Sequence, residues 1–210
     1  MRSYKSTALI VALVAIFATG ILFASIRVVS KGVTQRSEKS LDIKRYRAEP
    51  LELIDLKVSE QSVKGNIQVK RRINGDGLDS VKFQDKDEWF RRVKVKLRNV
   101  SDKPIASITA LLYFRPSTSD PYFGVDLTPS KELQDEGLQP GEEIELTVSD
   151  QSWNQTAEIL RMYGVDANKS VVSFSIDFVL FENGELWHRG GMIQKDPNNP
   201  RRWIPVEMPF

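Results

Sequence analysis

His188 is the only histidine of the chain, and none of its 210 residues is a cysteine. The sequence therefore provides no cysteine nucleophile and no disulfide, and a zinc ion would lack the further nitrogen or sulfur ligands that it needs. The sequence also contains no G-x-S-x-G elbow for a serine nucleophile. We interpret His188 as a surface residue. We predict no catalytic, metal or cofactor site, and we predict that the chain is not an enzyme.

Residues 74–79, Asn-Gly-Asp-Gly-Leu-Asp, place oxygen donors at alternate positions, as calcium-binding loops do. The fifth position is Leu78, and the twelfth is Asp85 instead of the glutamate that completes such a loop. We therefore interpret the segment as a glycine-rich turn between two strands.

The four tryptophans carry large aromatic faces that suit a sugar- or peptide-binding surface: Trp89, Trp153, Trp187 and Trp203. Aromatic side chains dominate burial in β-proteins, so the interpretation that we favour places each of them in the core or at its edge. Near the C-terminus we single out a candidate binding surface, composed of Trp187, His188, Arg189, Arg201, Arg202 and Trp203. Residues 201–210, which begin with Arg201, Arg202 and Trp203, are either a docking tail or an extra edge strand.

A row of cations, Lys94, Lys96 and Arg98, alternates with Val93, Val95 and Leu97. This period of two is typical of a half-buried strand in an antiparallel sheet. We expect the cations to pair across strands with Glu143 and Glu145 rather than to bind an anionic ligand.

The elements that position these residues are mainly strands. Alternation and turn residues predict strands over 51–58, 63–73, 91–100, 105–115, 122–127, 144–148, 171–181 and 186–194. Asn183-Gly184 marks a hairpin, and helical spacing over 152–163 before Gly164 predicts one short helix. We expect an immunoglobulin-like antiparallel β-sandwich, with a small open barrel as the alternative.

Residues 7–26 form a run of twenty residues without a charge. A helix of that length is about 30 Å long, which matches the hydrocarbon core of a bilayer. The run continues well past the small residues Ala18-Thr19-Gly20, so we favour an uncleaved single-pass anchor over a cleaved signal peptide. The expected organisation is a cytoplasmic tail (1–6), a transmembrane helix or signal anchor (7–26), a basic linker (27–48) and the β-domain (49–210).

The orientation of this anchor rests on two opposing signals. The signal-like start, with basic residues before the apolar run, favours a cytoplasmic N-terminus and a domain in the periplasm or at the cell surface. The positive-inside rule favours the opposite orientation. Six cations follow the apolar run and only two, Arg2 and Lys5, precede it. The six are Arg27, Lys31, Arg36, Lys39, Lys44 and Arg45. We favour the extracytoplasmic domain.

The net charge of +2 is unevenly distributed, because residues 48–210 hold 21 Lys and Arg against 26 Asp and Glu. A mildly acidic domain argues against binding to nucleic acid. The basic segment next to the anchor is either a solvated spacer or a contact with anionic lipid headgroups.

Two stretches, VKVKLRNVSDKPIASITALLYF and LQPGEEIELTV, resemble the extracytoplasmic immunoglobulin-like modules of the FxLYD kind. The matching parts are Asn99 to Ser101, Leu111 to Phe114, and Leu138 to Glu142, within a stretch of about 60 residues. The long loop between Phe114 and Leu138, the helix and the C-terminal hairpin depart from that pattern. The resemblance implies a fold and an envelope location, and it implies no activity.

These observations favour a non-enzymatic envelope module that binds another envelope protein or has a structural role. The alternative is a glycan-binding module that uses exposed aromatic side chains. The expected contact with the membrane is made by the N-terminal helix.

Overall fold

The computed structural model describes residues 36–115, 123–130, 133 and 137–206. These residues belong to a unit that begins at Arg36. The tail and the transmembrane helix that the sequence predicts over residues 1–26 lie outside the described residues. Among the residues that are described, no helix is long and apolar enough to cross a membrane.

The described part of the chain forms thirteen strands in one sheet, together with short helical segments. The strands are β1 (Ser37–Arg45), β2 (Leu51–Val58), β3 (Gln61–Ser62), β4 (Gln68–Ile73), β5 (Asp76–Asp85), β6 (Val93–Asn99), β7 (Ile105–Arg115), β8 (Phe123–Pro129), β9 (Glu143–Val148), β10 (Val171–Phe181), β11 (Leu186–His188), β12 (Gly191–Asp196) and β13 (Asn199–Val206). The helical segments are α2 (Asp150–Met162) and the 3₁₀ turns η1 (Lys64–Asn66), η2 (Trp89–Arg92) and η3 (Ala167–Lys169).

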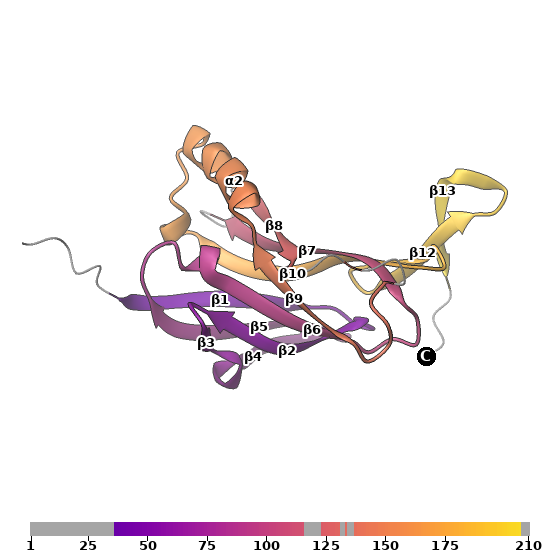
Figure 1. Ribbon diagram of the computed structural model, residues 1–210, viewed down its shortest axis with the longest axis horizontal. Helices are drawn as coiled ribbons and strands as arrows, with labels where there is room; N and C mark the ends of the chain where they lie inside the picture. Colours follow the sequence, from indigo (N-terminus) through magenta and orange to yellow (C-terminus); the bar gives the residue numbers. More distant parts are fainter. Residues whose placement is uncertain (1–35, 116–122, 131–132, 134–136, 207–210) are drawn as a thin grey trace, which may run out of the picture. The chain divides into compact units, whose positions relative to one another are not determined.

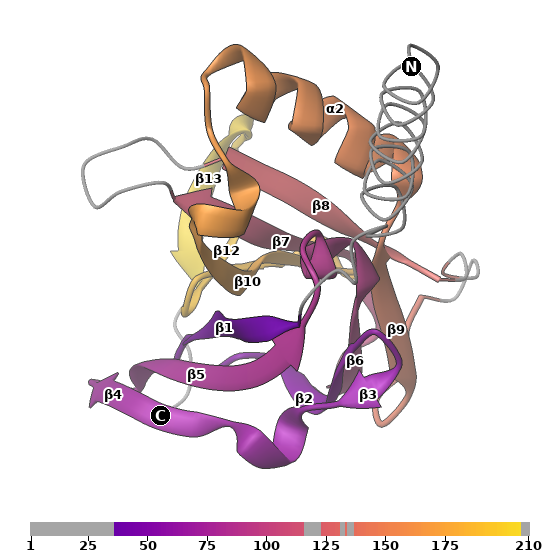
Figure 2. The ribbon, with the colours of Figure 1, turned by 90° about the vertical axis from the view of Figure 1, so that its left-hand side faces the viewer.

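Strand β10 is the branch point of the sheet. One of its edges pairs with β7, and the other is shared by β1, which runs parallel to β10, and by β11, which runs antiparallel. From β10 the sheet continues through β7, β8, β9, β6 and β2 to β3, and in the other direction through β1 and β5 to β4. Figure 1 shows these strands along the domain, and Figure 2 shows how the sheet curls round its core. The predicted mainly β class is confirmed. The finer assignment to an immunoglobulin-like sandwich of two sheets stays a prediction.

Strand β1 lies where the sequence predicted a linker, so that prediction is wrong for residues 37–45. Leu41 and Ile43 are fully buried between β5 and β10. The segment looked like a spacer because it has only these two alternating apolar residues among many charges. Its charges are neutralised across strands, for example by the ion pair between Asp42 and Lys70 at 2.6 Å.

Two other parts of the sheet differ from the predicted strands. Strand β5 was not predicted, because Gly77, Ser80 and several charged residues interrupt its apolar pattern. The predicted strand 186–194 is instead two short strands, β11 and β12. Arg189 and Gly190 both have positive φ angles, of 44° and 91°, and reverse the chain between them.

The predicted helix is confirmed as α2, which packs against β8. The side chain of Ser149 caps its first turn by accepting a hydrogen bond from the Ser152 amide at 3.1 Å. At the other end, Gly164 adopts φ +65° and the Val165 amide donates to the Leu160 carbonyl at 2.8 Å. This closure is a Schellman motif, which requires a residue such as glycine that tolerates the left-handed conformation.

Aromatic side chains from α2, η2 and β7 form one end of the core. The ring centroid of Phe90 lies 4.6 Å from that of Trp153 and 5.1 Å from that of Phe114. Trp89 and Trp153 are both buried, at 2% and 7% exposure. The prediction that these two tryptophans belong to the core is therefore confirmed.

The other local predictions are tested by the turns and by the exposed face of β6. Residues Asn74 and Gly75 form the turn between β4 and β5, as predicted, with φ angles of 51° and 87°.

Arg98 pairs with Glu143 directly across the sheet at 2.6 Å, and Lys96 contacts the same carboxylate. Lys94 pairs with Glu60 instead of a residue of β9.

Candidate functional site

The candidate surface predicted near the C-terminus is not one surface in the structure. Trp187 is fully buried, whereas Trp203 on β13 is 40% exposed. His188 is exposed and stacks on Phe178, with ring centroids 4.5 Å apart. Arg201 and Arg202 are exposed on β13, where the ammonium of Lys195 lies 5.6 Å above the Trp203 ring. The six residues are therefore divided between the core, the stack with Phe178, the ion pair of Arg189 with Asp177 and the β12–β13 hairpin.

Arg189 is exposed in the turn after β11 and pairs with Asp177, a buried carboxylate on β10. Its guanidinium lies 2.5 Å from the carboxylate of Asp177, which also accepts hydrogen bonds from Tyr113 and Ser175. Burial alone would raise the pKa of Asp177, but these hydrogen bonds outweigh it and hold the pKa below its usual value. Asp177 lies at an irregularity in the pairing of β10 with β7, where a bulge redirects side chains. The cluster is internally satisfied, so we assign it a structural role.

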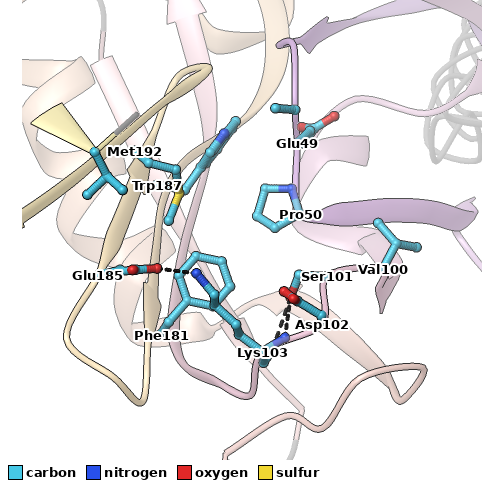
Figure 3. A pocket seen from close by; sticks show the side chains of 12 residues that line it. Glu49, Pro50, Val100, Ser101, Asp102, Lys103, Phe181, Glu185, Trp187 and Met192 are labelled. Carbon is cyan, nitrogen blue, oxygen red and sulfur yellow. Dashed lines mark hydrogen bonds and ion pairs between the residues drawn. The ribbon is translucent and has the colours of Figure 1, made fainter. Parts of the chain in front are cut away.

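A cavity of about 370 Å³ is the best candidate for a functional site. Five segments that are distant in sequence line it: the β1–β2 connection, the β6–β7 turn, the end of β10 with β11, β12 and the end of β13. Figure 3 shows Glu49 and the indole of Trp187 at one end of the cavity, with Lys103 and Glu185 at the other. Lys103 and Glu185 form an ion pair.

Buried polar atoms without a hydrogen-bond partner concentrate near this cavity. Within the described residues they are both carboxylate oxygens of Glu49, one oxygen of Asp79 and Nε1 of Trp187. Glu49 and Trp187 line the cavity themselves, and Asp79 acts electrostatically on Glu49. Buried polar groups in folded proteins are almost always hydrogen-bonded, and here ion pairs provide part of the compensation: Arg72 Nη2 lies 2.7 Å from Asp79 Oδ1. These atoms are closed off from solvent, so the cavity is lined by other atoms of Glu49 and Trp187.

The charge of Glu49 is only partly compensated. Arg45 Nη2 lies 3.1 Å from Glu49 Oε2, but the pair lacks the alignment of a hydrogen bond. Burial raises the pKa of Glu49 to about 7; the Arg45 guanidinium opposes this rise and the Asp79 carboxylate adds to it. Glu49 therefore exchanges its proton close to neutral pH, and a ligand that donates hydrogen bonds to it would favour its charged form.

The segment that carries Glu49 is held in place by Arg47. The Arg47 amide donates to Asp76 at 3.0 Å, and its Nε donates to the Gly190 carbonyl at 3.2 Å. A Cβ atom at Gly190 would lie 3.0 Å from the Arg47 side chain, so this turn needs a residue without one. Next to Glu49, Ala48 has a φ of 48°, which is rare for alanine.

A second hollow, of about 550 Å³, lies beside Arg36 and is lined by several cations. Three of them, Arg91, Arg92 and Lys94, form ion pairs with neighbouring carboxylates. We therefore regard this region as a network of surface ion pairs. In the parts of the chain that the structure describes, no group of three or more histidine, aspartate or glutamate residues is arranged to hold a metal ion.

Sequence reasoning missed the cavity, because its lining comes from five separate segments. The only available signal was Glu49-Pro50, a carboxylate at the start of the first predicted strand. Comparison with known proteins adds no assignment: no family model, curated protein or solved structure matches the chain.

Proposed function

We propose that the chain is a single-pass, membrane-anchored module whose β-domain lies outside the cytoplasm and binds another envelope protein without catalysing a reaction. The observation that carries the binding role is the cavity of about 370 Å³, whose lining combines apolar side chains with the charged side chains of Asp102, Lys103 and Glu185. The apolar run 7–26 supports the anchor.

Strand β1 weakens the main objection to this orientation. Three of the six cations that the positive-inside rule set against it, Lys39, Lys44 and Arg45, lie in β1. The rule applies to short segments beside the membrane, and folded domains are translocated largely regardless of their charge. The cations that remain, Arg27, Lys31 and Arg36, hardly outnumber Arg2 and Lys5 on the other side.

The same proposal includes an immunoglobulin-like domain of the FxLYD kind. Its support is that two of the resembling segments are joined to each other by hydrogen bonds. The backbone amide of Asn99 donates to the Glu142 carbonyl at 2.9 Å, and that of Gly141 donates to the Asn99 carbonyl at 2.8 Å. The motif residues therefore act together as one structural unit.

Glycan binding is the second candidate function, and Trp203 is the observation that favours it. This indole is 40% exposed, whereas Trp89, Trp153 and Trp187 are buried. Sugar-binding platforms usually combine aromatic faces, and Phe178, which stacks on His188, is a further exposed aromatic side chain. Loss of glycan binding in W203A, with binding retained in E49Q, would support this alternative.

Topology is testable because the chain has no cysteine of its own. A K169C variant places one thiol at a side chain that is 85% exposed in the domain, and an S3C variant places one in the N-terminal tail. A membrane-impermeant maleimide should label K169C and not S3C in cells whose outer membrane, if present, has been opened. Labelling of S3C alone would reverse the proposed orientation.

The binding role is testable by photo-crosslinking in the native membrane. Val100 lines the cavity and is 53% exposed, so a benzophenone amino acid at this position should reach a bound partner. Glu158, which is exposed on α2 and does not line the cavity, is the matched control position. A defined protein adduct from position 100 but not from position 158 is expected, and equal adducts from both positions would contradict the proposal.

A further inference from the structure

The chain enters the described domain at one end of the sheet, where Arg36 precedes β1. Strand β10 begins at the same end, because β1 and β10 run parallel. The turn after β5 meets η3 there, since the Glu88 amide donates to the side chain of Asn168 at 2.9 Å. Figure 2 looks onto this end of the domain, with α2 above β1 and β5. The cavity of about 370 Å³ lies at the other end, where β1 and β10 finish.

Helix α2 leaves an apolar strip exposed at the end where β1 begins. Ile159, Met162 and Tyr163 are spaced three and four residues apart, so they share one face of the helix. All three are exposed, Met162 the most at 73%. The Tyr163 ring contacts that of Phe123, with centroids 5.3 Å apart, and Phe123 pairs through Phe114 with the start of β10. Neighbouring exposed apolar side chains of this kind mark a contact surface.

Three exposed cations lie at the same end as this strip. Arg36 and Lys86 line the hollow of about 550 Å³, and Arg161 stands in the last turn of α2. Within the described residues none of the three forms an ion pair. They are therefore available to an anionic partner, unlike the other cations of that hollow.

Most carboxylates at this end are already compensated. The ion pairs are Lys39–Asp87, Arg91–Glu88 and Lys169–Asp166. Glu158, which is exposed on α2 beside the apolar strip, offsets one of the three available cations. The end as a whole thus combines a surplus of positive charge with exposed apolar side chains, which is the composition of surfaces that bind at a membrane interface.

The tether points to the same partner. The predicted anchor ends at residue 26, ten residues before Arg36, and ten fully extended residues span at most about 35 Å. A lysine or arginine held near an anionic bilayer surface raises affinity for it about fivefold. Apolar side chains of a surface helix enter the boundary between headgroups and acyl chains, where tyrosine is also favoured.

We propose that this end of the domain docks on the anionic headgroups of the membrane that holds the anchor. Arg36, Lys86 and Arg161 contact the lipid phosphates, and Met162 and Tyr163 enter the interface. The cavity at the other end then opens away from the bilayer, toward a partner. This inference rests on the proposed anchor and adds a defined orientation of the domain to the proposed function.

The test uses the full-length protein in vesicles of phosphatidylcholine, with or without phosphatidylglycerol. The chain has no cysteine, so a bimane fluorophore on M162C reports contact with the bilayer through quenching by nitroxide-labelled lipid. Both leaflets have the same composition, so either orientation of insertion gives the signal. N198C is the matched position, exposed in the β12–β13 turn, which Figure 1 shows far from the start of β1. Phosphatidylglycerol should strengthen quenching at position 162 at least about threefold and leave position 198 nearly unquenched.

Charge variants of the M162C protein separate docking from tethering. K86Q/R161Q should weaken the quenching that depends on phosphatidylglycerol about tenfold or more, because two cations are lost. R201Q/R202Q removes the same charge from β13 and should leave the quenching unchanged. Y163S should weaken it without changing the net charge.

Equal quenching at positions 162 and 198 would overturn the inference, and so would quenching at 162 that persists without phosphatidylglycerol or in K86Q/R161Q. Absence of quenching at 162, with the maleimide pattern as expected, would overturn the inference alone and leave the proposed anchor and binding role in place. A protein adduct from a benzophenone at position 162 in the native membrane, without quenching in vesicles, would assign this face to a protein partner instead.

Discussion

The side-chain amide of Asn99 donates a hydrogen bond to the carbonyl oxygen of Leu138 at 2.9 Å, and it makes this bond in a fully buried position. The same amide donates to the Lys103 carbonyl at 2.9 Å, while its oxygen accepts from the amide and hydroxyl of Ser101. One side chain therefore closes the β6–β7 turn and fastens the segment before β9 to it.

Replacing Asn99 should destabilise the domain strongly. An N99A variant removes all four of these hydrogen bonds, each of which contributes about 0.5–1.5 kcal/mol. The Leu138 carbonyl keeps the Ile105 amide at 3.0 Å, and the Lys103 carbonyl keeps the Ser101 hydroxyl at 3.0 Å. We expect the free energy of unfolding to fall by about 2–4 kcal/mol, measured by urea denaturation of the full-length protein in mild detergent. N154A, at an exposed position of α2, is the control and should change it by less than about 0.5 kcal/mol.

The Arg189–Asp177 pair should matter even though Arg189 was predicted as part of a binding surface. Because Asp177 is buried while the Arg189 side chain is 44% exposed, solvent replaces part of the lost contact in R189M, and we expect a loss of about 1–2 kcal/mol in urea denaturation at pH 7. R201M removes an exposed cation on β13 and should have little effect. An equally small effect of R189M would mean that the hydroxyls of Tyr113 and Ser175 suffice.

Asp177 should also contribute to acid unfolding. Its folded-state pKa is held below the usual value, so its stabilising effect is present above the unfolded pKa of about 3.9 and is lost as the pH falls through the folded pKa. D177N should therefore flatten the fall in stability between about pH 5 and pH 2. Denaturation midpoints of wild type and variant across this range provide the measurement, and parallel curves would argue against this role.

The parts of the fold that were predictable from sequence are those whose burial follows a simple period. Strands β2, β7 and β10 have the predicted bounds because apolar residues alternate along them or fill both faces. Strand β1 escaped prediction because Leu41 and Ile43 are its only fully buried apolar residues and its charges are neutralised by distant partners. Pairing of that kind depends on tertiary structure, which local patterns do not report.

The candidate site was less predictable than the fold, for a related reason. Trp187 belonged to the predicted candidate surface, although we favoured a core position for each tryptophan, and β11 turns its indole into the core. Glu49 lay at the boundary between the predicted linker and the predicted domain. Segments that are distant in sequence bury Glu49, and the local spacing of residues does not indicate burial of this kind.

Glu49 should make the domain less stable as the pH rises through neutrality. Its pKa is raised by burial from about 4.5 to about 7, so between these values the folded state holds a proton that the unfolded state has lost. Stability therefore falls with rising pH across this window, by about 3 kcal/mol in total. E49Q should remove most of this dependence, whereas E158Q should preserve it. Urea denaturation at pH 5 and pH 8 measures the difference.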